Sequence, residues 1–241
     1  MEFLMRKFTA IALGALFFMT QGVQASEFTK EQHSEIESIV ADYVSNHPEI
    51  IISAMQKLEK QEIQRHEDNV RSIGESLRIS NDAPSMGDGK RKHYIIDFYD
   101  YNCGYCKVME PMFEKAYKEL DAQIVYVDLP VITPQSKQIG VVAQALFNLD
   151  KDLFFKFHKI FMDRHDKDVS LDFIKDEVVK IGGDWDKVLK EMNSGRPQSQ
   201  IANYMKFASQ LAVRGTPYLI IDGQEFRGAI QSYEDLKMML K

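Results

Sequence analysis

Residues 94–106 read YIIDFYDYNCGYC and carry the strongest structural signal in the chain. They open with Tyr94 to Tyr99, a short apolar run bounded by charge, as expected of a buried strand. Two cysteines separated by two residues follow, and residues 107–120 have the pattern of a helix. Ile124-Val125-Tyr126-Val127 then predicts a second strand. A strand, a helix and a strand in this order predict a βαβ unit whose two strands are parallel.

Helices and a hairpin are predicted after this unit. Apolar residues recur at helical spacing over residues 136–210, and we interpret these stripes as core faces rather than a cofactor pocket. Two predicted strands, residues 218–221 and 225–227, flank Asp222-Gly223, which is a strong signal for a hairpin turn. Residues 233–240 predict a closing amphipathic helix.

Residues 1–25 have the pattern of a secretory signal peptide that is cleaved after about Ala25. Arg6 and Lys7 are followed by an apolar run from Phe8 to Met19, and small residues precede Ser26. The apolar run is short for a bilayer span, although an uncleaved anchor is the alternative. We therefore expect export to the periplasm, and the sequence leaves an outer-membrane association open.

Composition limits the classes of function. The chain has 241 residues and a formal net charge of −6, so it has no sequence-wide basis for binding nucleic acid. Its length permits one full domain with an appendage. Only two cysteines are present, which is few for an exported protein in an oxidising compartment.

The appendage is predicted over residues 26–79, which look helical with a break before Pro48. Apolar residues at 63, 70 and 77 continue a long, thin stripe that one small domain cannot easily cover. We therefore expect this segment to mediate self-association, with a dimer favoured over a trimer. The alternative is a solvated helix lying on its own domain. Residues 80–90, SNDAPSMGDGK, predict a linker to a catalytic domain over residues 91–241.

The Cys103–Cys106 pair has three interpretations: half of a zinc site, a structural bridge, or a redox pair. Zinc needs four ligands, yet the chain lacks a second cysteine pair and its six histidines are scattered. A bridge across so small a loop constrains the unfolded chain little. The redox interpretation is favoured, and no metal ligand is assigned.

The position of the pair supports redox chemistry. A cysteine at a helix N-terminus faces unpaired backbone N–H groups and the positive end of the helix dipole, which favour an anion. We therefore expect Cys103 to be the attacking thiolate, since the thiolate is the reactive species in disulfide exchange. Cys106, one turn into the helix, is placed to resolve the mixed disulfide.

These residues resemble the signature of the thioredoxin superfamily. Asp97 lies six residues before Cys103, where the family keeps a buried acid that exchanges protons with the second cysteine. Pro111 matches the proline that kinks the active-site helix. Thr216-Pro217 resembles the family's cis-proline loop, which implies a cis bond and a backbone edge that binds peptide substrates. An ordinary strand-edge Asp and a trans turn proline are the alternatives.

The resemblance covers residues 94–241 and implies a thioredoxin fold, an α/β fold, with a DsbA-like helical insertion over about 136–210. The dipeptide Gly104-Tyr105 differs from the Pro-His usual in DsbA oxidases and is similar to the CGYC of DsbC isomerases. With its helical N-terminal oligomerisation segment, the chain resembles oligomeric DsbA-like proteins typified by ScsC and the Com surface-antigen group. The resemblance implies no cofactor.

The implied activity is thiol–disulfide exchange on unfolded or misoxidised exported proteins. We favour an isomerase or a mixed isomerase/oxidase, because no histidine between the cysteines stabilises the thiolate further. A dedicated DsbA-like oxidase is the alternative, as is a non-enzymatic chaperone or copper-handling surface protein. A membrane redox partner, DsbD-like or DsbB-like, is expected.

Overall fold

The computed structural model describes residues 28–165 and 169–240, so the predicted signal peptide lies outside the described residues. The described part of the chain divides into two compact units, with the boundary between Gln56 and Lys57. No helix in the described ranges combines the length and apolarity that a bilayer crossing requires.

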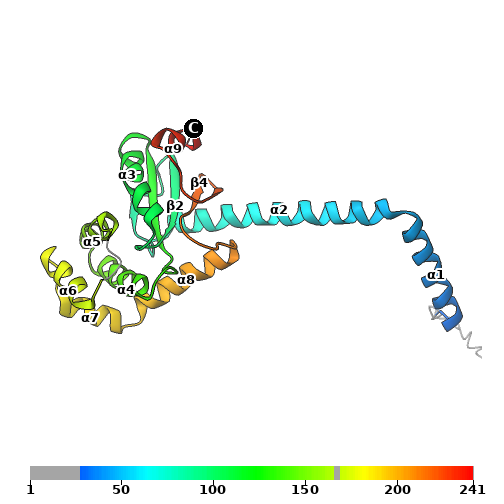
Figure 1. The fold of residues 1–241 in the computed structure, drawn as a ribbon, viewed down its shortest axis with the longest axis horizontal. Coiled ribbons are helices and arrows are strands. Elements are labelled where there is room, and N and C mark those ends of the chain that lie inside the picture. The colour runs from blue at the N-terminus through cyan, green and yellow to red at the C-terminus, as the bar shows by residue number, and fades with distance from the viewer. Residues whose placement is uncertain (1–27, 166–168, 241) are drawn as a thin grey trace, which may run out of the picture. The chain divides into compact units, whose positions relative to one another are not determined.

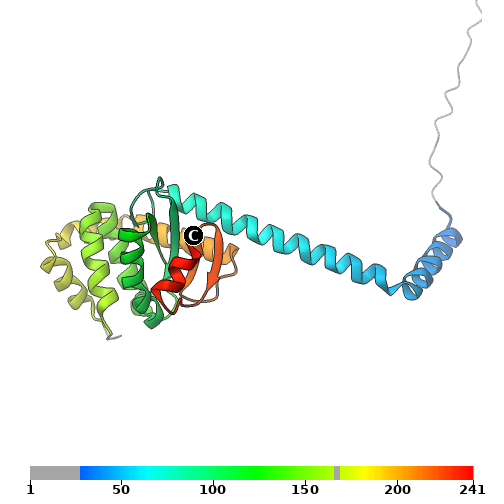
Figure 2. The ribbon, with the colours of Figure 1, turned by 90° about the horizontal axis from the view of Figure 1, so that it is seen from above.

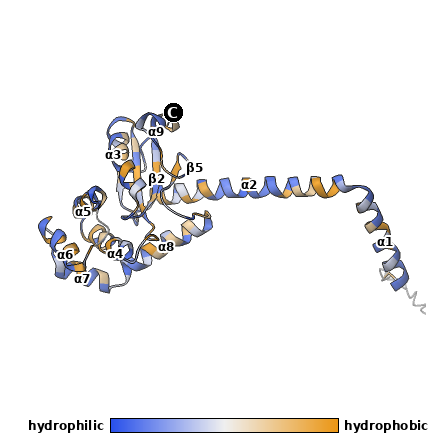
Figure 3. Ribbon diagram, viewed as in Figure 1, coloured by the Kyte–Doolittle hydropathy of each residue, from blue (hydrophilic) through white to orange (hydrophobic). Residues whose placement is uncertain are grey.

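Two helices form the predicted helical N-terminal segment. α1, Lys30–Asn46, begins with a capping box in which Thr29 Oγ1 accepts from the Gln32 amide at 3.3 Å and Gln32 Oε1 accepts from the Thr29 amide at 2.9 Å. α2, Pro48–Ile79, is a continuous helix of 32 residues that starts at the proline, as predicted. Figure 3 shows hydrophobic residues recurring along an otherwise hydrophilic α2.

The unit from residue 57 onward is built on a five-stranded mixed sheet of order β1-β3-β2-β4-β5. β2, His93–Tyr99, and β3, Ala122–Asp128, are parallel and are joined by the helix α3, Gly104–Glu119. The predicted βαβ unit is therefore confirmed. β4, Tyr218–Ile221, pairs antiparallel with β2 and with β5, Gln224–Arg227. Figure 1 shows α3 beside these strands.

The hairpin between β4 and β5 turns at the two residues that the sequence indicated. Asp222 and Gly223 have φ values of 47° and 82°, which is the left-handed pair that a two-residue type I′ turn requires.

One strand was not expected. β1, Ser85–Met86, lies within the predicted linker of residues 80–90 and pairs antiparallel with β3 at Val125 and Ile124. Ala83 is buried as well. This part of the chain therefore packs on the sheet, and two strand residues are too few to produce the alternation by which a strand is recognised.

Helices cover both faces of the sheet, and Figure 2 gives a second view of them. One face packs on α3 and on α9, Tyr233–Met239. The other face packs on α8, Arg196–Gln210, and on the last turns of α2. Gly74 permits close approach there, because a Cβ at this position would lie 3.1 Å from Ile220 Cγ2. The α2 residues buried in that core are Val70, Ile73 and Leu77.

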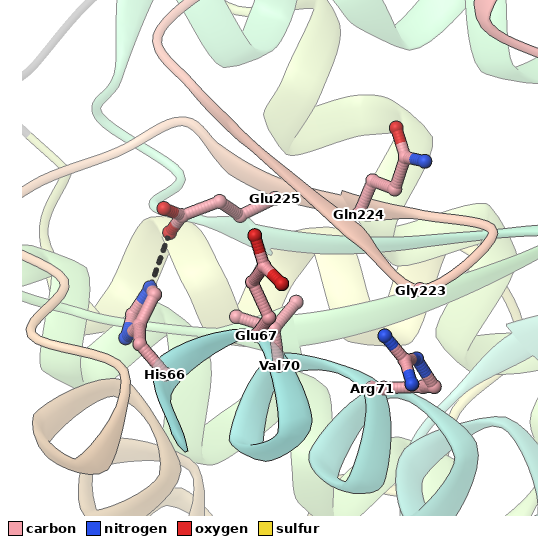
Figure 4. Close-up of a pocket in the computed structure, with 7 residues that line it drawn as sticks. All are labelled: His66, Glu67, Val70, Arg71, Gly223, Gln224 and Glu225. Carbon is pink, nitrogen blue, oxygen red and sulfur yellow. Dashed lines mark ion pairs between the residues drawn. The ribbon is translucent and has the colours of Figure 1, made fainter. Parts of the chain in front are cut away.

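An ion pair adds to this contact between α2 and the β4–β5 hairpin. His66 Nε2 lies 3.0 Å from Glu225 Oε2, and Figure 4 shows this ion pair among the residues that line a pocket. Glu225 also accepts hydrogen bonds from the Tyr218 hydroxyl and from Arg227, both at 2.9 Å. The hairpin that follows Pro217 is thus fastened to α2.

The predicted helical block over residues 136–210 is confirmed as an insertion between β3 and β4. Figure 1 shows its first four helices gathered next to the sheet. These helices are α4, Pro134–Leu149; α5, Lys151–Asp163; α6, Leu171–Lys180; and α7, Trp185–Asn193, and α8 completes the insertion.

Candidate active site

The two cysteines lie at the N-terminus of α3, and both are free thiols. Cys103 is the N-cap residue, and its Sγ accepts a hydrogen bond of 3.4 Å from the Cys106 amide. Cys103 retains 5% of its surface exposed, whereas Cys106 has none. An incoming disulfide can therefore reach the first sulfur only.

The two thiols differ in acidity. The pKa of Cys103 is lowered to about 6, first by the hydrogen bond from the Cys106 side chain, with further contributions from Thr216 and from the backbone amides of α3. The pKa of Cys106 is raised strongly, chiefly because burial disfavours its thiolate. At neutral pH Cys103 is the ionised sulfur and Cys106 holds its proton.

Asp97 is a fully buried carboxyl group on β2. Neither of its oxygens has a hydrogen-bond partner among the described residues. Burial raises the pKa of Asp97 well above its ordinary value, and the nearby charges of Glu110 and Cys103 raise it further. The negative charge of Asp97 in turn contributes to the high pKa of Cys106. The raised pKa lets this carboxyl group hold a proton at pH values where an exposed aspartate is ionised.

The Thr216–Pro217 peptide bond is cis, and the loop that contains it contacts the first cysteine. When protonated, the Cys103 thiol donates to the Thr216 carbonyl oxygen at 3.4 Å. The fold thus brings Thr216 into contact with the sulfur of Cys103, although the two residues are 113 positions apart in the sequence.

The dipeptide between the cysteines faces outward. Tyr105 is 67% exposed, and no heavy atom lies within 4 Å of an ideal Cβ at Gly104. Two further apolar side chains, Val131 and Ile132, are 49% and 44% exposed in the loop after β3.

Asp100 organises this loop and was missed in the sequence. Its Oδ2 accepts from the amides of Val131 and Ile132, both at 2.9 Å. Its Oδ1 accepts from the Asn102 amide and the Ser136 hydroxyl, both at 2.7 Å. Asp100 thereby joins the start of α3 to the start of α4. The only available signal was an acid between a buried strand and the cysteine pair.

No group of three or more His, Cys, Asp or Glu side chains within residues 28–165 and 169–240 is arranged to hold a metal ion. With its own atoms, this site can carry out two steps. One sulfur attacks a disulfide to form a mixed disulfide, and the other sulfur then attacks the first and releases the bound partner.

Residues 80–241 match the family model described as Thioredoxin. The chain belongs to the thioredoxin family. Residues 32–65 of this thioredoxin-family chain match a second model, described as the copper resistance protein ScsC N-terminal domain. The chain is a thiol–disulfide oxidoreductase of the DsbA-like, ScsC-like type.

Two solved structures illustrate the similarity. ScsC of Proteus mirabilis, in a transitional conformation, is 21% identical, with a TM-score of 0.64 over 88% of this chain and 95% of that one. The thiol-disulfide exchange protein alpha-DsbA2 of Wolbachia pipientis is 25% identical, with a TM-score of 0.66 over 73% of this chain and 95% of that one.

A curated relative is similar in sequence. The probable disulfide bond formation protein D of Bacillus cereus is 21% identical over 163 residues, which are 62% of this chain and 74% of the relative.

Proposed function

We propose that this protein is a periplasmic disulfide isomerase, or a mixed isomerase/oxidase, that acts on unfolded or misoxidised exported proteins. Cys103 attacks and Cys106 resolves. The observation that carries the proposal is the difference between the two thiols: one ionised and reachable, the other protonated and enclosed. Export rests on the sequence pattern of residues 1–25.

The reaction begins when the Cys103 thiolate attacks a client disulfide. A bond forms between Cys103 and one client sulfur, the client disulfide breaks, and the second client sulfur leaves as a thiolate. The freed thiolate can then attack elsewhere in the client, which rearranges its disulfides. If rearrangement stalls, Cys106 attacks Cys103, the enzyme disulfide forms, and the client leaves reduced. Reduction of the enzyme by a DsbD-like membrane partner would restore the dithiol.

Asp97 serves this last step by accepting the Cys106 proton. A buried thiol cannot become a nucleophile without a nearby base, and a carboxyl group whose pKa is raised well above its ordinary value is a suitable one. The Thr216–Pro217 loop would hold the client next to Cys103, because its carbonyl already contacts that sulfur.

The dipeptide favours isomerase over dedicated oxidase activity. An oxidase needs a strongly stabilised thiolate, because a stable reduced form makes the enzyme's own disulfide a strong oxidant of its client. Tyr105 supplies no positive charge beside Cys103. The Cys103 thiolate is therefore stabilised by the helix N-terminus and by its hydrogen bonds. A DsbB-like partner would be expected only for the oxidase.

Refolding of scrambled ribonuclease and reduction of insulin test the proposal together. The reduced wild-type protein should accelerate both reactions, and Cys103→Ala should abolish both. Cys106→Ala should retain part of the isomerase activity, because rearrangement needs only the first sulfur. Chaperone activity that survives in Cys103→Ala, without acceleration of either reaction, would support a non-enzymatic role. A fully oxidised enzyme at steady state in cells would support the oxidase.

We further propose that residues 26–79 mediate self-association, as a dimer, while residues 91–241 form the catalytic domain. Apolar side chains along α1 and the first part of α2 are unusually exposed, between 40% and 64%. Exposed apolar stripes on helices are commonly covered by another copy of the helix. The match of residues 32–65 to the ScsC N-terminal domain supports this assignment. The exposed residues are Ile36, Ile39, Val40, Tyr43, Ile50, Ile51, Ile52, Met55, Leu58 and Ile63.

A further inference from the structure

Side chains from three elements meet at the carboxylate of Glu225 on β5, the strand at one edge of the sheet. Its Oε2 atom accepts hydrogen bonds from the Tyr218 hydroxyl on β4 and from Arg227 Nη2 on β5, both at 2.9 Å. His66 Nε2 on α2 lies 3.0 Å from the same oxygen, and Figure 4 shows this pair. One oxygen atom therefore joins β4, β5 and α2.

These contacts hold both ends of the cis-proline loop, residues 211–217, which connects α8 to β4. Tyr218 follows this loop directly, and its hydroxyl is fixed on Glu225. Arg227 donates to the carbonyl oxygens of the first two residues of the loop, at 3.4 and 3.3 Å. The start and the end of the loop are thus tied to one carboxylate, through Arg227 and Tyr218.

Tyr218 is held rigidly between this carboxylate and the sheet. Only 1% of Tyr218 is exposed, and its ring packs edge-on against Phe98 of β2 with the ring centroids 5.6 Å apart. The guanidinium carbon of Arg227 lies 5.5 Å from the centroid of the Tyr218 ring. Burial, and then the hydrogen bond to Glu225, raise the pKa of Tyr218, so its hydroxyl remains a donor at neutral pH.

Glu225 is ionised where its donors can use it. Burial opposes its ionisation, but the contacts with His66, Tyr218 and Arg227 outweigh burial and lower the pKa of Glu225 below its ordinary value. Hydrogen bonds to a charged acceptor are stronger than those between neutral groups. The loop ends are therefore held by charge-assisted bonds.

His66 marks the place where α2 meets this contact. Later along the helix, Val70 and Leu77 are buried against the sheet, whereas Ile63, just before His66, is 54% exposed. The helix whose exposed part is proposed to mediate self-association therefore reaches the cis-proline loop through a single carboxylate.

We propose that Glu225 is a positioning residue for client binding: held by His66, it fixes both ends of the cis-proline loop, so that the loop backbone is presented to a client beside Cys103. The inference rests on the proposed role of this loop in holding clients. Glu225 contacts neither of the two sulfurs, so it acts on client binding rather than on the exchange of disulfides.

The test is the steady-state reduction of a disulfide-bonded peptide by the chain from Ser26, with dithiothreitol as the reductant. Glu225→Gln keeps the shape of the side chain but removes its charge, so the loop ends are held less firmly. KM should rise on the order of fivefold, the effect of about one hydrogen bond, while kcat changes by less than about twofold. Alkylation of Cys103 by iodoacetamide at pH 8 should keep the wild-type rate, because this small reagent does not use the loop.

Glu67→Gln is the matched control. Glu67 follows His66 on α2 and lines the same pocket as Glu225, so this variant removes the same charge from the same surface (Figure 4). Its KM should equal that of the wild type. Tyr218→Phe removes one of the donors and should also raise KM. Combined with Glu225→Gln, it should add nothing, because the two residues belong to one network.

Three results would overturn the inference while leaving the proposed function intact. They are a wild-type KM in Glu225→Gln, an equal rise of KM in Glu67→Gln, and a fall of kcat and of Cys103 alkylation at unchanged KM. The last result would mean that Glu225 only supports the fold. Absence of peptide reduction by the wild type would instead defeat the proposed function.

His66→Gln covers the case in which Glu225→Gln does not fold, because it changes a helix residue and leaves the hairpin sequence intact. This variant should raise KM and speed the hydrogen exchange of the amides of residues 214–216, whereas Glu67→Gln should change neither. A wild-type KM together with wild-type exchange in His66→Gln would then overturn the inference.

Discussion

Cys103 and Cys106 are three residues apart, yet their surroundings give them opposite acidities. Cys103 caps the helix and receives hydrogen bonds, whereas Cys106 lies one turn inside, enclosed by core residues and faced by Asp97. Hydrogen bonds to an anion lower a pKa, and burial without compensation raises the pKa of a thiol. The division of labour between the sulfurs follows from position along one helical turn.

The residue between the cysteines offers a way to adjust this balance. Tyr105 is 67% exposed, so Tyr105→His leaves the core untouched and brings an imidazolium close to Cys103. The pKa of Cys103 should fall by on the order of one unit below its value of about 6. Ultraviolet absorbance of the thiolate against pH measures this shift. Tyr105→Phe should not move the midpoint, and a His variant equal to the Phe variant would contradict the electrostatic argument.

Ionisation of the buried Asp97 should lower the unfolding free energy of the protein as the pH rises. Its folded-state pKa lies above its unfolded value, so its contribution is favourable at low pH and is lost as the pH rises through the folded pKa. Asp97→Asn removes this dependence. The unfolding free energy of the variant should gain on the wild type as the pH increases above about 4, by at most about 1.4 kcal/mol per pH unit.

Urea unfolding of both reduced proteins between pH 4 and pH 8 measures this difference. A gap that stays constant over the range would mean that Asp97 does not titrate differently in the folded and unfolded states.

At the scale of elements, the contact between α4 and β3 depends on one glycine. A Cβ at Gly140 would lie 2.0 Å from Asp128 Oδ2, and Asp128 is buried. Gly140→Ala should therefore force α4 away from the sheet and destabilise the protein by about 1–3 kcal/mol. Gly104→Ala, at a helical glycine with open space, should change the stability by less than about 1 kcal/mol. Thermal unfolding of the two variants compares them, and equal stabilities would contradict the packing argument.

Local patterns explain which elements could be predicted. Three of these patterns are contained within a few neighbouring residues: the apolar run of β2, the helical period of α3 and the Asp222-Gly223 turn. β1 could not be predicted, because its two residues are defined only by pairing with β3. The end of α2 raised the same difficulty. From the sequence, Val70 and Leu77 fit a self-association stripe as well as a core face, and only the structure shows that they pack against the sheet.

The candidate site divides in the same way. The cysteine pair, Asp97 and Pro217 have fixed positions along the chain that a motif can capture. His66 and Glu225 are far apart in the numbering, and only the packing of α2 on the sheet brings them together. Asp100 is likewise defined by amides more than 30 residues away. Contacts of this kind depend on tertiary structure and leave no local periodicity.

At the scale of the whole molecule, the expected self-association can be separated from the chemistry. A chain that begins at Lys57 keeps the buried residues of α2 and loses most of the exposed apolar stripe. It should be monomeric by light scattering, reduce insulin at the wild-type rate, and lose most of the ribonuclease isomerase activity.

The matched comparison is the chain from Ser26, which should scatter as a dimer. If the Ser26 chain is monomeric, the self-association proposal is wrong. If the Lys57 chain keeps full isomerase activity, association is not required for rearrangement.

The most direct test of the central claim is the reactivity of each cysteine as a function of pH. The reduced Ser26 chain is treated with iodoacetamide at a series of pH values, and the modified cysteine is identified by mass spectrometry. Cys103 should react with a midpoint near pH 6, while Cys106 stays unmodified across the range. A midpoint near the ordinary thiol value of about 8.5, or modification of Cys106 before Cys103, would contradict the account.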